Sequence, residues 1–337
     1  MEITKPIRRS FADEHVIGID PPMQPSLPNV WRRRIHAFAG RSVSDKALTA
    51  EQSLRSGMQR LYGLSLTPGL VEGLELAPEN GAIGAAPGDA LIRLEPGFGL
   101  ARSGEDISAS RTVRLPIGRL PVIARVDGGG GGGDGIAEEG DESPAFTSRL
   151  RPELPRAIGD TLSQRIAAGT ADSLPRAGIV VAQPITAELI GTPLDDCRPD
   201  PRDDPYIDLQ RVDGLRLALY IWPGEMVALD GGADYALPAR GPAWRNRLAH
   251  GVFSVESLFA PDEAHPWESW GVPLALAGFT EDWNLAFIDR QAVARSGGKP
   301  RSRSRTGIAG GDDRLWQARL DQFTAQLGDL DTLDPAS

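Results

Sequence analysis

The sequence predicts a β-rich α+β fold, in which a small antiparallel β domain precedes a second mixed domain, with an extended N-terminal arm and a C-terminal helix. Glycine accounts for 39 and proline for 28 of the 337 residues, an excess that favours turns and short strands over long helices. Short runs in which apolar residues alternate with other residues recur between these turns. Strand-like and helix-like segments follow one another in a mixed order, which is typical of α+β proteins.

Residues 1–42 are predicted to form an extended docking arm. Four prolines between positions 21 and 28 disfavour a regular helix or a central strand, and apolar residues are spaced along the segment. Such a segment either lies along the surface of a partner or packs over its own domain. Three arginines beside a tryptophan suit docking on an acidic protein groove. The candidate partner-docking residues of the arm are Trp31, Arg32, Arg33, Arg34 and Phe38.

Residues 43–126 are predicted to form a helix followed by the small β domain. The stretch from Thr49 to Gln52 resembles a capping box, and an approximate apolar stripe continues to Gly63, where the helix is expected to end. From Leu64 onward the apolar period changes to that of strands. Short strand-like stretches follow, joined at Pro-Gly, Gly-Asp and Ser-Gly turns.

A run of glycines followed by acidic residues predicts a linker over residues 127–147, because such a segment cannot bury apolar surface. The run does not fit a phosphate-binding loop, which needs lysine and Ser/Thr after the last glycine, since Asp134 follows here. Beyond the linker, residues 148–295 are predicted to form the second, α+β domain.

Strand and helix patterns are mixed within this second domain. Helices are expected within residues 160–174 and 243–260, and a strand over 176–190. Residues 205–229 are expected to form strands, with Asp213-Gly214 as a hairpin turn. The tryptophan-rich stretch after residue 265 is expected to form a strand, a turn and then a strand or a helix.

The C-terminal part is predicted to be a basic linker over residues 296–312, followed by a docking helix over 313–330. Arg295 begins the basic run, which is interpreted as a solvated linker that fits an acidic partner surface. Asp312 and Asp313 favour a helix N-terminus, and an apolar stripe follows them. A helix of this length can dock on a partner. Its candidate partner-docking residues are Leu315, Trp316, Leu320 and Phe323.

The net charge of −10 disfavours nucleic acid and anionic membranes as partners, because the long-range field of the protein repels phosphate. No run of about 18 apolar residues predicts a membrane-spanning helix, and the first residues hold no apolar core of a signal peptide. We therefore expect a protein that is made in the cytoplasm and is not inserted into a membrane. The single cysteine, Cys197, allows no intrachain disulfide, and its acidic surroundings disfavour a reactive thiol.

Residue patterns typical of catalysis or of metal and cofactor binding are weak. The four histidines show no metal-ligand spacing, and neither a nucleophile elbow nor a dinucleotide-binding glycine motif occurs. The acidic loop over residues 195–204 is interpreted as an exposed Asp-Pro turn rather than a cation site, since Arg198 and Arg202 compete for its carboxylates. We expect no catalytic residue, no metal and no cofactor.

One segment keeps a carbohydrate-active enzyme or sugar-binding module open as the alternative. Residues 262–290 combine carboxylates, which glycoside hydrolases use in pairs, with aromatic side chains that sugar sites use as platforms. The same tryptophans are equally explained as core residues. The residues concerned are Glu263, Glu268, Glu281, Asp282, Trp267, Trp270 and Trp283.

The turns of the first β domain follow a recognisable pattern. Pro-Gly-x-Val-x-Gly-Leu occupies residues 68–74, Pro-Gly-x-Gly-Leu occupies 96–100, and Gly-Glu-Asp-Ile occupies 104–107. The glycines permit tight bends, and the alternating apolar residues face one side of a small sheet. The stretch 61–123 resembles a module of structural proteins in phage tails and phage-tail-like contractile injection systems. The turn residues that carry the resemblance are Pro68, Gly69, Gly73, Pro96, Gly97 and Gly104.

The resemblance implies a non-enzymatic structural subunit, with baseplate assembly or fibre attachment as its role. It implies other baseplate, tube, sheath or fibre proteins as partners, and multiple copies in each particle. Such a chain is made in the bacterial cytoplasm and becomes a component of an assembled phage or tail-like particle. The sequence departs from a tail fibre in lacking long β repeats. A soluble binding module that acts alone is a third possibility.

Overall fold

A computed structural model describes residues 45–125, 156–190, 209–223, 242–258, 265–299 and 313–331. The chain divides into two compact units, Met1–Leu61 and Tyr62–Ser337. Several predictions lie outside the described residues. These are the docking arm with Trp31, Arg32, Arg33, Arg34 and Phe38, the linker over 127–147, the acidic loop with Cys197, and residues 300–312 of the basic linker.

Helix α1 (Asp45–Leu64) is the described part of the first unit and ends in the second. It agrees with the predicted helix and ends one residue beyond the expected stop. Backbone bonds from Ser65 to Tyr62 and from Leu66 to Gly63, both 3.0 Å, close its last turn. Leu48 and Met58 on this helix are exposed apolar residues.

Two small antiparallel sheets make up the first part of the second unit. One has the strand order β1-β4-β5 and the other β2-β3-β6. Glycine and proline interrupt the apolar runs between the strands. Among these strands, consecutive ones pair only at β2-β3 and at β4-β5, and at the other connections the chain passes from one sheet to the other. The strands are β1 (Gly69–Gly73), β2 (Leu76–Pro78), β3 (Leu91–Leu94), β4 (Gly97–Leu100), β5 (Asp106–Ala109) and β6 (Val113–Pro116).

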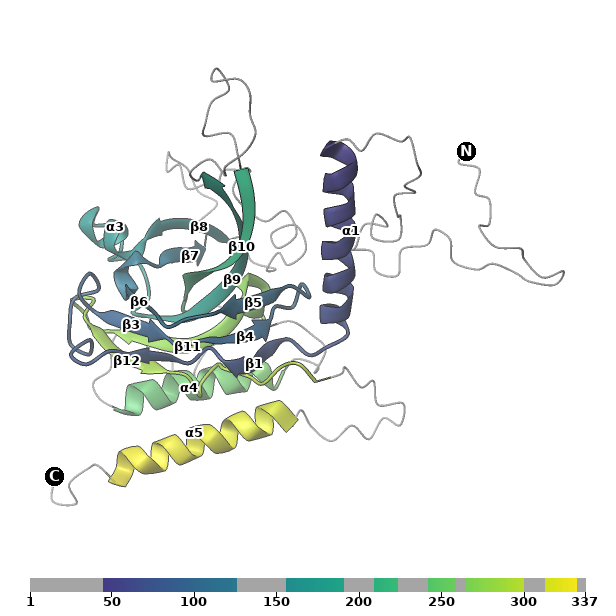
Figure 1. The fold of residues 1–337 in the computed structure, drawn as a ribbon. Helices are drawn as coiled ribbons and strands as arrows, with labels where there is room; N and C mark the ends of the chain where they lie inside the picture. The colour runs from purple at the N-terminus through teal and green to yellow at the C-terminus, as the bar shows by residue number, and fades with distance from the viewer. Residues whose placement is uncertain are drawn as a thin grey trace, which may run out of the picture. The chain divides into compact units, whose positions relative to one another are not determined.

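A six-stranded mixed sheet forms the centre of the second unit, in the order β12-β11-β9-β10-β7-β8 (Figure 1). Strands β7 and β10 are parallel, and the other neighbours are antiparallel. The strands are β7 (Pro121–Arg125), β8 (Arg156–Thr161), β9 (Ala177–Ile190), β10 (Leu209–Ile221), β11 (Val272–Phe279) and β12 (Leu285–Asp289). The predicted strand-rich α+β class is confirmed.

The predicted hairpin turn at Asp213-Gly214 is wrong. Strand β10 runs straight through these residues, with Asp213 opposite Thr186 and Gly214 opposite Ile185. The whole of β10 pairs in antiparallel register with Gly178–Ile190 of β9. This long ladder of cross-strand bonds outweighs the local preference of an Asp-Gly pair for a turn.

The helices of the second unit lie between and after these strands. Helix α3 (Leu162–Ala167) begins with a capping box, in which Thr161 and Gln164 bond to each other's backbone nitrogens. The others are α4 (Pro242–Glu256), α5 (Asp313–Asp331) and the 3-10 turns η2 (Ile117–Arg119) and η3 (Glu268–Trp270). In the part of the chain that the structure describes, every helix is too short or too polar to cross a membrane.

Both faces of the six-stranded sheet are buried. On β9, Val180 and Ala182 belong to the core shared with the small sheets, whereas Ile179 and Val181 belong to the core shared with α4. Figure 1 shows α4 along the sheet. Residues from the predicted small β domain and from the predicted α+β domain, such as Ile107 of β5 and Val180 of β9, share one core. The structure thus joins in one unit the two segments that the sequence analysis separates.

Candidate functional site: a buried charge cluster and an exposed helix ridge

The turn glycines of the predicted module meet at the pairing of β1 with β4. Gly73 lies opposite Gly97, and Gly69 lies opposite Leu100. Gly73 has a φ of 58°, and a Cβ at this position would overlap the carbonyl oxygen of Pro96. Gly104, with a φ of 83°, closes the turn between β4 and β5. These positions need glycine for backbone geometry.

The chain after β12 lies along the start of β1. The nitrogen of Leu70 donates to the carbonyl of Arg295 at 2.8 Å, and Gly297 donates back to Leu70 at 2.6 Å. Further on, Thr67 donates to the carbonyl of Lys299 at 2.7 Å. Residues 296–299 of the predicted basic linker are therefore packed against the strand that carries the Pro68-Gly69 turn. Pro68 itself lies just before this strand.

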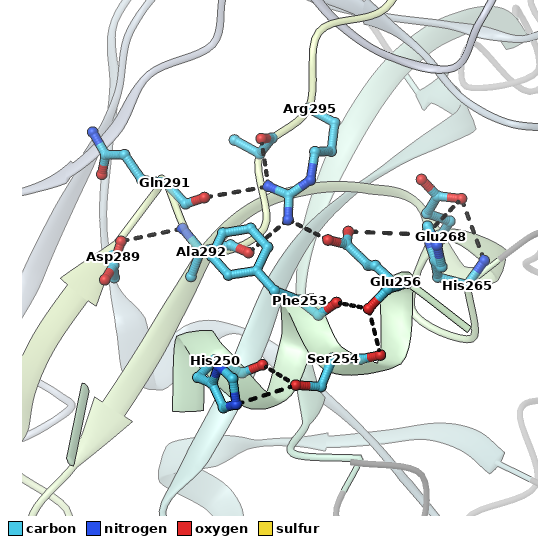
Figure 2. A network of polar contacts seen from close by, with 12 residues as sticks. His250, Phe253, Ser254, Glu256, His265, Glu268, Asp289, Gln291, Ala292 and Arg295 are labelled. Carbon is cyan, nitrogen blue, oxygen red and sulfur yellow. Dashed lines mark hydrogen bonds and ion pairs between the residues drawn. The ribbon is translucent and has the colours of Figure 1, made fainter. Parts of the chain in front are cut away.

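This placement buries Arg295 beside the last turn of α4. Its Nη2 donates to Oε2 of Glu256 at 2.5 Å, and both side chains are less than a tenth exposed. The guanidinium also lies 5.0 Å from the ring centre of Phe253 and donates to three backbone carbonyls (Figure 2). The carbonyl acceptors are those of Gln291, Ala292 and Ala294. The interpretation of Arg295 as the start of a solvated linker is wrong, because the residue is part of the core.

His265 and Glu268 extend this cluster on the other side of Glu256. The Nδ1 atom of His265 lies 3.4 Å from Oε2 of Glu268 and 4.0 Å from Oε1 of Glu256 (Figure 2). Arg102, from the turn between β4 and β5, reaches to 3.7 Å from the same oxygen of Glu268. The imidazole stacks on Trp267, with ring centres 5.4 Å apart. The buried charge cluster, defined as Arg102, Glu256, His265, Glu268 and Arg295, thus joins four segments of the second unit.

The cluster shifts the pKa values of two of its members. Burial raises the pKa of the Glu256 carboxyl, although the charge of Arg295 opposes the rise. At His265, burial lowers the pKa, but the hydrogen bond and negative charge of Glu268, together with the charge of Glu256, outweigh it. The pKa of His265 is therefore raised above 6.5. A proton on either group is held more tightly in the folded protein than in the unfolded chain.

We expect replacement of His265 by glutamine to reduce the pH dependence of stability. Because the pKa of His265 is raised on folding, its contribution is complete below pH 6.5 and is lost as the pH rises through the higher value of the folded state. Urea unfolding from about pH 6 to about pH 8 should show a smaller loss of stability in the variant than in the wild type. An equal loss in both proteins would contradict the assignment.

His250→Gln is the matched control for this experiment. His250 is exposed on α4, where the hydroxyl of Ser254 donates to its backbone carbonyl at 2.8 Å (Figure 2). Its side chain is outside the buried charge cluster, and we expect the substitution to change the free energy of unfolding by at most about 0.5 kcal/mol.

A second buried carboxylate fixes helix α5 to the same unit. Oδ2 of Asp289, at the end of β12, lies 3.2 Å from Nε of Arg245 on α4 and accepts a 3.2 Å bond from Nε2 of Gln322 on α5. Ala318 of α5 is buried in the core with α4. The C-terminal helix therefore docks one of its faces on its own chain, whereas the sequence analysis expected it to find its place on a partner.

The opposite face of α5 carries apolar side chains that are exposed. We define the α5 ridge as Trp316, Leu320, Phe323 and Leu327, whose exposed fractions are 64%, 58%, 56% and 46%. Leu315, the other predicted docking residue, is partly buried against the core with α4. The structure thus brings three of the four predicted helix residues, Trp316, Leu320 and Phe323, to one outer face.

The tryptophans of the segment 262–290 are core residues in the structure. Trp267, Trp270 and Trp283 are at most 8% exposed, and Arg176 covers the ring of Trp283 at 3.9 Å. Their ring faces are therefore not available as a sugar platform. Glu281 and Asp282 are exposed, Glu268 is in the buried charge cluster, and Glu263 lies outside the described residues.

A small pocket borders the buried charge cluster. Gly69, Arg102, Glu268 and Arg295 contribute to its lining, and it has room for about one water molecule. Among the described residues no group of three or more potential metal-ligating side chains has the geometry to hold a metal ion. The cluster is suited chemically to holding segments together by paired charges rather than to accommodating a substrate.

Sequence reasoning missed the buried charge cluster. Glu256 and Arg295 are 39 residues apart and Arg102 comes from another sheet, so no local spacing relates them. The available signal was a single charged residue within an apolar stretch, as Glu256 is in Phe-Ser-Val-Glu-Ser-Leu-Phe and Arg295 is after Ala-Val-Ala. Such a charge is buried only when it is paired.

No protein-family model matches the chain, and no curated protein matches it.

Proposed function

We propose that the chain is a non-enzymatic structural subunit of a phage tail or a phage-tail-like contractile particle, with baseplate assembly or fibre attachment as its task. On this proposal it is made in the bacterial cytoplasm and is then built into the particle in multiple copies beside baseplate, tube, sheath or fibre proteins. The observation that carries the proposal is the α5 ridge, an apolar surface on a helix whose opposite face is fixed to its own unit.

The energetics of the α5 ridge favour a role in assembly. Four large apolar side chains side by side in water are unfavourable, and contiguous patches of this kind mark protein contacts in soluble proteins. Because the buried residues Ala318 and Gln322 pack the opposite face of α5 against the unit, the helix is already ordered. Binding through the ridge therefore does not carry the entropic cost of ordering a free helix. A preorganised apolar surface suits a subunit that binds its neighbours in an assembly.

The rest of the unit supports a scaffold more than an enzyme. The buried charge cluster pairs its acids with Arg102 and Arg295, and the pocket beside it has room for about one water molecule. The turn glycines that resemble the phage-tail module serve the close approach of β1 and β4. Both features favour a rigid unit, as a structural subunit requires.

The proposal is tested by asking whether the chain is part of a particle. Particles purified by density-gradient sedimentation from the source bacterium should contain the chain at fixed stoichiometry with sheath and tube proteins. Leu320→Asp should lower its incorporation at least tenfold, because a charge on the α5 ridge opposes burial there. Leu258→Asp is the matched control, since Leu258 is an exposed leucine two residues beyond the end of α4 and is not one of the ridge residues.

Two results would contradict the proposal. One is the absence of the chain from all particle fractions while it remains abundant in the soluble fraction. The other is incorporation of Leu320→Asp at the wild-type level. Deletion of residues 1–42 provides a further test, since the docking arm is expected to be needed for incorporation but not for folding of the second unit.

A further inference from the structure

The spacing of the α5 ridge is the same in both directions along the helix. Its residues follow at intervals of four, three and four, and with 3.6 residues per turn they fall within an arc of about 60°. This is the spacing of a coiled-coil seam, in which alternate intervals of three and four keep apolar residues facing one partner. The buried positions Ala318 and Gln322 lie on the other side of the helix.

An α5 helix of a second copy fits this ridge when the two helices are antiparallel and related by a two-fold axis. In that arrangement Trp316 faces Leu327 of the second copy and Leu320 faces its Phe323, and the same two contacts recur beyond the axis. Each layer then combines an aromatic with an aliphatic side chain, so the layers have similar volumes. A parallel pairing would instead place Trp316 on Trp316 and leucine on leucine, with layers of unequal size.

The residues that flank the α5 ridge are compatible with this arrangement. In the antiparallel pair Arg319 comes near Gln326 of the other copy, and Gln317 comes near its Thr324, so that no like charges meet. The guanidinium of Arg319 also lies 5.6 Å from the ring centre of Trp316, where it can make a cation–π contact beside the ridge. Antiparallel helices additionally oppose their dipoles.

We infer that the α5 ridge binds the α5 ridge of a second copy of this chain as an antiparallel two-helix pair. The inference deepens the proposed function and rests on its interpretation of the ridge as a subunit contact. The four side chains together expose on the order of 400 Å², so that the pair buries roughly 800 Å², an area typical of weak contacts. We therefore expect the free protein to be in a reversible monomer–dimer equilibrium.

Sedimentation equilibrium of the purified full chain is the first test. The wild type should show a dimer that dissociates in the micromolar concentration range, and Leu320→Asp should weaken the dimer at least tenfold. Leu258→Asp should dimerise like the wild type. Thermal unfolding of each variant identifies any that has lost its fold. A wild type that stays monomeric up to about 100 µM would overturn the inference, as would equal dimerisation of wild type and Leu320→Asp.

Disulfide crosslinking tests the direction of the pair. In a Cys197→Ser background, one protein carries Leu320→Cys and another carries Phe323→Cys. Antiparallel pairing brings positions 320 and 323 of different copies together, so that mild oxidation of the mixture should give far more crosslinked dimer than oxidation of either protein alone. Equal crosslinking of the single proteins and the mixture would overturn the antiparallel arrangement.

The two proposals fail in different ways. A chain that sediments as a monomer but whose incorporation into particles is lost with Leu320→Asp refutes the self-pairing and leaves the structural role intact, with another particle protein on the ridge. A chain that dimerises through α5 but occurs in no particle supports the self-pairing and refutes the particle role.

Discussion

Replacement of Arg295 by methionine should lower the free energy of unfolding of the second unit by about 3–5 kcal/mol. The substitution keeps much of the volume of the side chain but leaves the carboxylate of Glu256 buried without its 2.5 Å partner. It also removes the donor to the carbonyls of Ala292 and Ala294, which order the chain after β12. Urea unfolding monitored by tryptophan fluorescence measures the loss.

The pH dependence of the destabilisation by Arg295→Met provides a specific test of the role of the buried Glu256–Arg295 pair. Burial already raises the pKa of Glu256, and loss of the Arg295 charge removes the main influence that lowers it. The protonated carboxyl needs no counter-ion, so the destabilisation of Arg295→Met should be smaller at acid pH than at neutral pH. The double variant Glu256→Gln with Arg295→Met should be more stable than the sum of the single losses predicts.

Arg114→Met is the matched control for the buried pair. Arg114 forms a 2.7 Å ion pair with Glu79 in the same unit, but its side chain is 58% exposed. Exposed pairs contribute little because water screens the charges, so we expect a loss below about 1 kcal/mol. Similar losses for Arg114→Met and Arg295→Met, or strict additivity in the double variant, would refute the role of the buried charge cluster.

Elements with strong local patterns could be predicted from the sequence. The continuous apolar run Val272–Phe279 is a strand buried along its whole length, and the amphipathic stretch before the C-terminus is the helix α5. The alternation of apolar residues around Pro68 and Pro96 indicated small antiparallel strands, which β1 and β4 confirm. In each case the signal lies within a few neighbouring residues.

Features that depend on distant partners could not be predicted. The parallel pairing of β7 with β10 joins Val122 to Leu219 and so connects the predicted small β domain with the predicted α+β domain, although nothing in either stretch specifies the other. Asp213-Gly214 has the sequence of a turn and yet continues a strand, because the residues before and after it pair with β9 without interruption. The partners of Arg295 are set by how β12, α4 and β1 pack, and the basic residues after it suggested a solvated linker instead.

Gly73→Ala should destabilise the second unit by about 2 kcal/mol more than Gly81→Ala. Both glycines have positive φ, 58° and 80°, so each alanine meets the same backbone cost of about 1–2 kcal/mol. At Gly81 the added methyl meets nothing within 4 Å, whereas at Gly73 it would overlap the carbonyl oxygen of Pro96. That oxygen already accepts a 3.2 Å bond from the nitrogen of Leu74.

The comparison separates steric from conformational effects, because the two variants differ only in what surrounds the methyl group. If Gly73→Ala and Gly81→Ala lose the same stability in urea unfolding, the close approach of β1 and β4 does not require glycine. If Gly73→Ala loses more, the glycine in Pro-Gly-x-Val-x-Gly-Leu is explained by the distance between two backbones. The motif that resembles the phage-tail module then marks a way of pairing two strands, and the contacts that serve assembly must be sought on other surfaces, such as the α5 ridge.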